Sequence, residues 1–253
     1  MSNSGGMHSP VEQFEIKPLV ELSLGGFDIS FTNSSLFMLL AMVISAIFLT
    51  VAMRRADMVP SRMQGAAEMM YEFVAEMVRS NVGSEGRPYF PFIFTLFVFL
   101  LFGNMLGLIP YSYTFTSQII VTFAMAAFVF VGVTVIALLK HGLHFFSFFV
   151  PAGAPKVLIP FLIVIEVISY FVRPVSLSVR LFANMLAGHT MLKVFAGLAV
   201  MISSAGGLAM AGSLLPFLAL IGLTGLEVLV AALQAYVFTI LTCMYLNDAL
   251  HLH

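Results

Sequence analysis

Three ionisable residues recur every seven positions within a strongly apolar part of the sequence: Glu166, Arg173 and Arg180. Because seven residues turn an α-helix through nearly two full turns, these side chains would form one stripe about 21 Å long, which Asn184 continues by one turn. A charge in lipid costs about 2.5–3.5 kcal/mol even on a lenient insertion scale, so intramembrane charges normally face a water-filled path or a partner. The stripe therefore predicts an ion pathway.

A second set of polar residues follows the stripe or lies on the next long apolar block. His189 and Lys193 are one helical turn apart, and Glu227 and Gln234 are again separated by seven residues. We expect these residues to belong to the same pathway.

A purely structural arrangement is the alternative for some of these residues. Glu166 and Arg173 could form a buried ion pair, while His189 and Lys193 extend to the membrane interface. Arg180 does not fit this alternative, because two arginines against one glutamate leave a cation uncompensated, and arginine cannot release its proton. We therefore expect a carboxylate of another subunit to approach Arg180.

The composition indicates that membrane helices carry these residues. Of the 253 residues, 60% are hydrophobic and 9% are charged, whereas a soluble domain carries about 25% charged residues. We expect an all-α polytopic membrane protein, with an N-terminal tail at residues 1–35 and a single membrane domain at residues 36–253. Its five spans are predicted at residues 36–53, 90–109, 119–139, 157–195 and 208–246.

Length and packing signals differ among the spans. Each of the last two blocks would be about 58 Å long as a helix, too long for one upright span. Each could be two short spans with a tight turn or one long, steeply tilted helix, since Pro174 and Pro216 could mark a turn or a kink. The second and third spans predict a hairpin, in which Gly103 and Gly107 would let two helices approach closely.

Residues 61–80 predict a different kind of helix. Glutamates recur every four residues from Glu68 to Glu76, and apolar side chains occupy the opposite side. This pattern is typical of an amphipathic helix that lies at the membrane interface or docks a partner. A solvated connector helix is the alternative.

Basic residues are distributed unevenly between the loops. Residues 54–87 contain five arginines and residues 140–156 contain two lysines, whereas the tail has only Lys17 and the connection at 110–118 has no basic residue. Because basic loops stay inside, we expect the N-terminus outside and, after five spans, the C-terminus inside.

Other function classes lack their sequence signals. A net charge of −1 provides no basic surplus for nucleic acid, and the single cysteine, Cys243, allows no internal disulfide or cysteine-rich metal site. The sequence contains no phosphate-binding loop, HExxH or GxSxG pattern. We expect no catalytic site, no cofactor and no metal.

The context of these polar residues resembles the a subunit of F-type ATP synthases. The main matching segments are Pro174-Val-Ser-Leu-Ser-Val-Arg-Leu-Phe-Ala-Asn-Met-Leu-Ala-Gly-His189, Leu226-Glu227 and Leu233-Gln-Ala-Tyr-Val-Phe-Thr239. Phe31–Phe37, Gly107–Tyr111 and Tyr245–Asp248 are similar as well, and the likeness extends from Val11 onward. Many bacterial relatives carry an acid at position 189 and a histidine at position 227, so the arrangement here resembles the mitochondrial and alphaproteobacterial branch.

The resemblance implies a stator that guides protons through two aqueous half-channels against a rotating ring of c subunits and couples this flow to ATP synthesis. Arg180 would separate the half-channels by attracting the ring carboxylate. By the same likeness, Asn184 and Gln234 lie beside it, His189 and Glu227 line the inlet, and Glu166 lines the outlet. We expect His189 and Glu227, from different helices, to share a site at this inlet that is accessible to protons and whose proton affinity depends on both groups. Apart from the likeness, Arg173 is a possible secondary candidate.

The implied partners are the c-subunit ring, a b-type subunit of the peripheral stalk, the rest of the ATP synthase and membrane lipid. The implied location is the bacterial inner membrane or, alternatively, the mitochondrial inner membrane.

A rival function is a secondary transporter whose intramembrane arginine binds an anionic solute, which predicts an internal repeat. The two long blocks share their length but no motif, which disfavours that rival. A membrane anchor of a respiratory complex would have no use for the arginine stripe.

Overall fold

The fold is built almost entirely from helices. The computed structural model describes residues 16, 18–21, 23–24, 27–28, 30–54, 58–109, 112–149, 158–204, 206 and 212–251. Its α-helices are α1 (Asn33–Met53), α2 (Arg62–Asn81), α3 (Phe90–Gly107), α4 (Ile119–His141), α5 (Ile159–Ser204) and α7 (Leu214–Leu250). They are joined by the 3₁₀ helices η2 (Gly83–Tyr89), η3 (Phe115–Ser117) and η4 (Gly142–Phe149). Residues 1–15, Lys17, Arg55, Pro110 and Lys156, which entered the tail, turn and loop-charge predictions, lie outside the described residues.

Short strands precede α1 in the segment that the sequence assigns to the tail. Thr32 ends the last of them and caps α1, because its side chain accepts a hydrogen bond from the backbone N–H of Ser35. The helix therefore begins at Asn33 rather than at residue 36. The strands pair antiparallel, β1 (Pro18–Val20) with β4 (Phe31–Thr32) and β2 (Ser23–Leu24) with β3 (Phe27–Asp28).

Five helical segments are long and apolar enough to cross a membrane: α1, the segment Gly83–Gly107 that contains α3, α4, α5 and α7. The prediction of an all-α polytopic membrane protein with five spans is therefore confirmed. Boundaries differ most in the last two spans. The helix α5 ends at Ser204 rather than at residue 195, and α7 begins at Leu214 rather than at residue 208.

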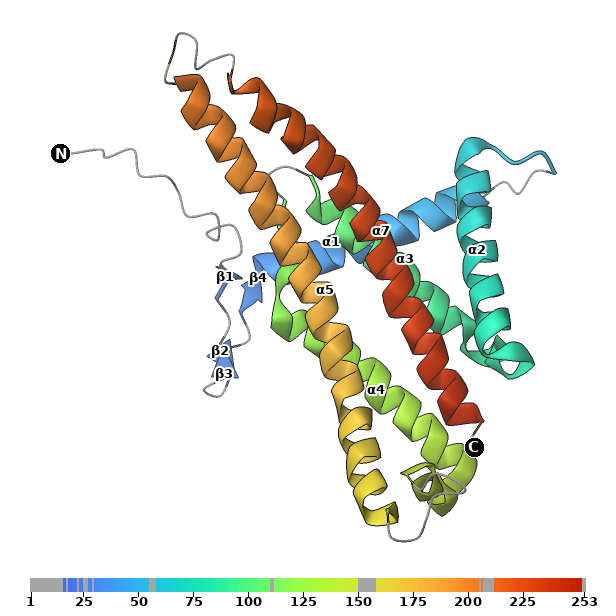
Figure 1. Ribbon diagram of the computed structural model, residues 1–253. Helices are drawn as coiled ribbons and strands as arrows, with labels where there is room; N and C mark the ends of the chain where they lie inside the picture. The colour runs from blue at the N-terminus through green and yellow to red at the C-terminus, as the bar shows by residue number, and fades with distance from the viewer. Residues whose placement is uncertain are drawn as a thin grey trace.

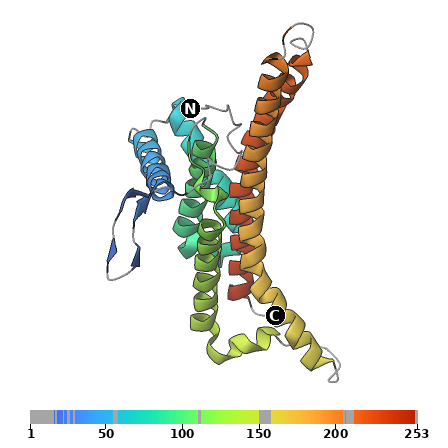
Figure 2. The same ribbon diagram turned by 90° about the vertical axis from the view of Figure 1, so that its left-hand side faces the viewer.

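The last two spans are single long helices of 46 and 37 residues. Pro174 lies inside α5 without ending it, so the alternative of two short spans with a turn is wrong for this block. The helices α5 and α7 run side by side, and α1 crosses them at a steep angle (Figure 1). Figure 2 shows α5 and α7 as one outer layer, α3 and α4 in the middle and α1 on the far side.

The predicted amphipathic helix is α2. Ser61 caps it by accepting a hydrogen bond from the backbone N–H of Gln64. On its apolar side Val74 is fully buried, and the ring of Phe73 lies 5.6 Å from that of Tyr236 on α7, between ring centroids. The helix therefore packs against the membrane helices of its own chain.

The two glycines at the end of α3 make a close contact that differs from the predicted one. A Cβ at Gly107 would lie 2.5 Å from the Thr114 hydroxyl oxygen, and a Cβ at Gly103 would overlap the ring of Phe115. The expectation that these glycines bring two membrane helices together is therefore wrong. They make room for the segment that joins α3 to α4.

Candidate functional site

His189 of α5 and Glu227 of α7 meet where the two long helices pack together. Both side chains are buried, and His189 Nδ1 lies 3.2 Å from Glu227 Oε1. Apart from this approach, the Glu227 carboxyl has no hydrogen-bond partner in the part of the chain that the structure describes. The structure therefore brings the two predicted residues together, at a distance at which the protonation of one group affects the other.

Gly188 allows Glu227 to reach this position. A Cβ at residue 188 would lie only 2.8 Å from Glu227 Oε1 and 3.2 Å from its carboxyl carbon. The carboxyl thus packs directly against the backbone of α5. The sequence offered a signal for this role, a glycine immediately before the candidate histidine, but the residue was not predicted to take part.

A third element reaches the same pair. Thr114, which lies just before η3, places its hydroxyl oxygen 2.8 Å from His189 Nε2. Thr114 is 3% exposed, so this contact is shielded from solvent. Thr114 was not predicted from the sequence, because a threonine in a connecting segment carries no periodic signal.

Arg180 has a different environment from the other candidate residues. Its side chain is exposed on α5, while its neighbours Ser178 and Leu181 are buried against the bundle. Among the described residues, no carboxylate forms an ion pair with Arg180. The exposed side of α5 next to it carries small residues, Ser176 and Ala183. The surface of α5 beside Arg180 therefore has little side-chain bulk at these two positions.

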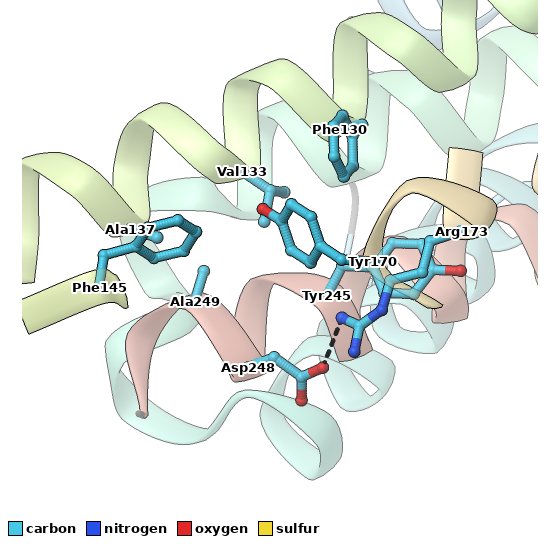
Figure 3. A pocket seen from close by; sticks show the side chains of 9 residues that line it. All are labelled: Phe130, Val133, Ala137, Phe145, Tyr170, Arg173, Tyr245, Asp248 and Ala249. Carbon is cyan, nitrogen blue, oxygen red and sulfur yellow. Dashed lines mark hydrogen bonds and ion pairs between the residues drawn. The ribbon is translucent and has the colours of Figure 1, made fainter. Parts of the chain in front are cut away.

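Arg173 forms a pair that the sequence did not predict. Its guanidinium donates a hydrogen bond from Nη1 to Oδ2 of Asp248 on α7, at 2.8 Å. The rings of Tyr170 and Tyr245 flank the guanidinium, with centroids 5.6 and 5.3 Å from Cζ. These side chains line a cavity of about 20 Å³, and Figure 3 shows how they lie around it. The alternative of a Glu166–Arg173 ion pair is wrong, because Asp248 takes that place.

A buried polar network connects α3 to α7. Asn104 is fully buried, donates a hydrogen bond to the carbonyl of Ala231 at 3.1 Å and accepts one from the Thr116 hydroxyl at 2.9 Å. An amide within an apolar span needs such partners, because an unpaired polar group is costly there. Because Asn104 is a polar residue within an otherwise apolar span, the sequence alone could have identified it as a residue that hydrogen-bonds a neighbouring segment.

The remaining candidate residues lie along the same two helices. Asn184 and Glu166 are half-buried on α5, and Gln234 is 8% exposed on α7. Arg180 is about 10 Å along the helix axis from Arg173 and about 14 Å from His189. Two ionisable clusters therefore flank an exposed, permanently charged residue.

Comparison with known proteins places the chain in a family. The family model described as "ATP synthase A chain" matches residues 35–247. The proteins named "ATP synthase subunit a" from Rhodospirillum rubrum and Parvibaculum lavamentivorans are 58% and 55% identical, over 98% and 96% of this chain and 100% and 93% of the relatives. The protein of the same name from Pelagibacter ubique is 53% identical over 97% of this chain and 98% of its own length. The chain therefore belongs to the family of ATP synthase A chains, the a subunits of the membrane sector of F-type ATP synthase.

Proposed function

We propose that Arg180 separates two proton half-channels within this stator subunit. The subunit is not catalytic by itself and acts as the proton channel of the membrane sector. In the proposal, His189 and Glu227 line the inlet, Glu166 lines the outlet, and Asn184 and Gln234 provide polar surfaces beside the arginine. The observation that carries the proposal is the exposed Arg180, which lies between two ionisable clusters and has no carboxylate partner in the described chain.

The chemistry of arginine suits this role. Its guanidinium stays charged at any physiological pH, so it cannot pass a proton from one half-channel to the other. An unpaired cation at membrane depth is costly, and a carboxylate brought by another subunit offsets that cost. The small exposed residues Ser176, Ala183 and Ala187 on the same side of α5 would let a partner helix approach.

The proposed source of that carboxylate is a ring of c subunits that rotates past α5. A neutral, protonated ring carboxyl can face lipid, whereas the ionised form is attracted to Arg180. We further propose that a b-type subunit of the peripheral stalk holds the chain against the ring. Arg173, held by Asp248, takes a secondary place on the outlet side. A secondary transporter is not favoured, because the chain belongs to the family of ATP synthase A chains.

For the membrane setting, we propose the bacterial inner membrane, with residues 1–35 as an outside tail, residues 36–253 as one membrane domain, and the C-terminus inside. The arginines between α1 and α3 support this orientation. In a Cys243→Ser background, a cysteine replacing Ser4 should react with an impermeant thiol reagent added outside. A cysteine replacing Arg62 should react only from inside, and the opposite labelling pattern would overturn the orientation.

The role of Arg180 is tested by proton-driven ATP synthesis in membrane vesicles that contain the whole complex. Arg180→Ala should abolish synthesis, while the soluble sector, once detached, still hydrolyses ATP. Arg180→Lys should also fail severely, because an ammonium group is a strongly hydrated point charge and can lose its proton in a desolvated site. Arg79→Ala, in the last turn of α2, is the matched control and should retain synthesis. Normal synthesis in Arg180→Ala would refute the proposal.

A further inference from the structure

The imidazole of His189 is held on both sides by groups from different elements. Its Nδ1 atom lies 3.2 Å from Glu227 Oε1, and its Nε2 atom lies 2.8 Å from the hydroxyl oxygen of Thr114. The two ring nitrogens therefore have different partners. The partner of one nitrogen determines which proton the other can exchange.

A third group fixes the direction of the hydrogen bond between Thr114 and His189. The Thr114 hydroxyl donates to the carbonyl of Gly107, 3.1 Å away. A hydroxyl has a single proton to donate, and a backbone carbonyl can only accept. With its proton directed to Gly107, the Thr114 oxygen accepts a hydrogen bond from Nε2–H of His189. This arrangement leaves Nδ1 as the nitrogen that faces the carboxyl.

We propose that Thr114 is a positioning residue that keeps the Nε2 proton of His189 in place and reserves Nδ1 for proton transfer with Glu227. The inference rests on the proposed inlet role of the His189–Glu227 pair. In the transfer, the proton on Glu227 Oε1 moves to Nδ1 and leaves an imidazolium beside a carboxylate, and the reverse step restores two neutral groups. The Nε2 proton does not move, so the pair handles one proton at a time.

The position of Thr114 is itself well defined. Gly107 ends α3, where its carbonyl lacks a partner within the helix, and the hydroxyls of Ser112 and Thr114 both donate to it. A Cβ at residue 107 would collide with the Thr114 side chain. The hydroxyl of Ser117 donates to the backbone carbonyl of Thr114 at 2.6 Å. Thr114 is thus anchored through both its side chain and its backbone.

Few other titratable groups can act on this pair. Glu227 faces His189 from α7, and Lys193 lies one turn further along α5. Tyr113 in the connecting segment stays neutral, because burial raises the pKa of its phenol, and it accepts a hydrogen bond from Gln118. The helices α1 and α3 contain no titratable residue, and those of α4 lie in its last turn, at the opposite end from η3.

The test compares Thr114→Val, which removes the hydroxyl and keeps the shape, with Thr114→Ser, which keeps the hydroxyl. In vesicles with the whole ATP synthase, the rate of proton-driven synthesis is measured against the pH on the loading side. Thr114→Val should lower the rate about tenfold. It should also shift the half-maximal rate to a lower pH by about one unit, because the imidazolium loses the acceptor for Nε2–H. Thr114→Ser should match the wild type in both measurements.

Thr239→Val is the matched control, since Thr239 is fully buried and its hydroxyl donates to the backbone carbonyl of Ala235. It should leave the pH profile unchanged. A wild-type profile in Thr114→Val would overturn the inference, as would an equal loss in Thr114→Ser. Thr114→Ala provides the same comparison if valine impairs assembly. Glu227→Gln separates the two proposals: full synthesis in this variant refutes the inlet, whereas loss of synthesis beside an unaffected Thr114→Val refutes only the role of Thr114.

Discussion

Replacing Gly188 by alanine would place a methyl group against the carboxyl of Glu227. The new Cβ would lie 2.8 Å from Oε1, 3.2 Å from Cδ and 3.3 Å from Cγ, whereas nonbonded carbon atoms rest about 3.5–4.0 Å apart. The carboxyl must therefore move by roughly 0.3–0.8 Å, which changes its present 3.2 Å approach to His189. Because a misplacement of about 1 Å can cost about 100-fold in a positioned reaction, we expect proton-driven synthesis to fall roughly 10–100-fold.

The same substitution should leave the helix intact. Alanine is favoured over glycine in a helix interior by about 1 kcal/mol, so α5 itself is not weakened. Gly197→Ala on the same helix is the matched control, because a Cβ there meets nothing within 4 Å. The assay is the initial rate of ATP synthesis in vesicles under a fixed proton gradient, with thermal unfolding of the purified complex measured in parallel. A wild-type rate in Gly188→Ala would refute the idea that the carboxyl must lie against α5.

Two further predictions concern pairs between α5 and α7. Asp248→Asn removes the anionic partner of Arg173 and should lower the free energy of unfolding by about 1 kcal/mol, measured as a lower Tm of the complex. An unchanged Tm would mean that the pair does not stabilise the packing of α7 against α5. Exchanging His189 and Glu227 for one another should restore more synthesis than either single substitution, because an imidazole and a carboxyl would again face each other. If the exchange is no better than the worse single variant, the two groups act separately.

The spacing of charged residues predicted their order along α5 but not the contact of Arg173 with α7. Glu166 and Arg173 share one side of the helix, yet seven residues separate them by about 10 Å along its axis, too far for an ion pair. Arg173 instead meets Asp248, 75 residues away in the sequence. Contacts of this kind depend on the register between α5 and α7, which periodicity within one helix does not contain.

Contacts between segments also determined the roles of a proline and of a glycine pair, which their local sequence did not settle. Pro174 could have ended a span, but it is buried within a continuous α5. A glycine pair at the spacing of Gly103 and Gly107 predicts a neighbouring backbone, and the neighbour proved to be the Thr114–Phe115 segment that follows the same helix. Apolar length, in contrast, sufficed to predict five membrane helices, because the thickness of the bilayer sets that length directly.

The most direct test of the role of Arg180 is the amount of ATP formed per proton taken up after an acid pulse, measured in the same vesicles for wild type and Arg180→Ala. Each proton that crosses releases about 2.3 kcal/mol per 100 mV, and a direct leak between the half-channels would lose this driving force. We expect Arg180→Ala to form no ATP per proton, with passive uptake equal to or greater than that of the wild type. A ratio of ATP to protons close to the wild-type value in Arg180→Ala would contradict the assignment and leave Arg173 as the next candidate.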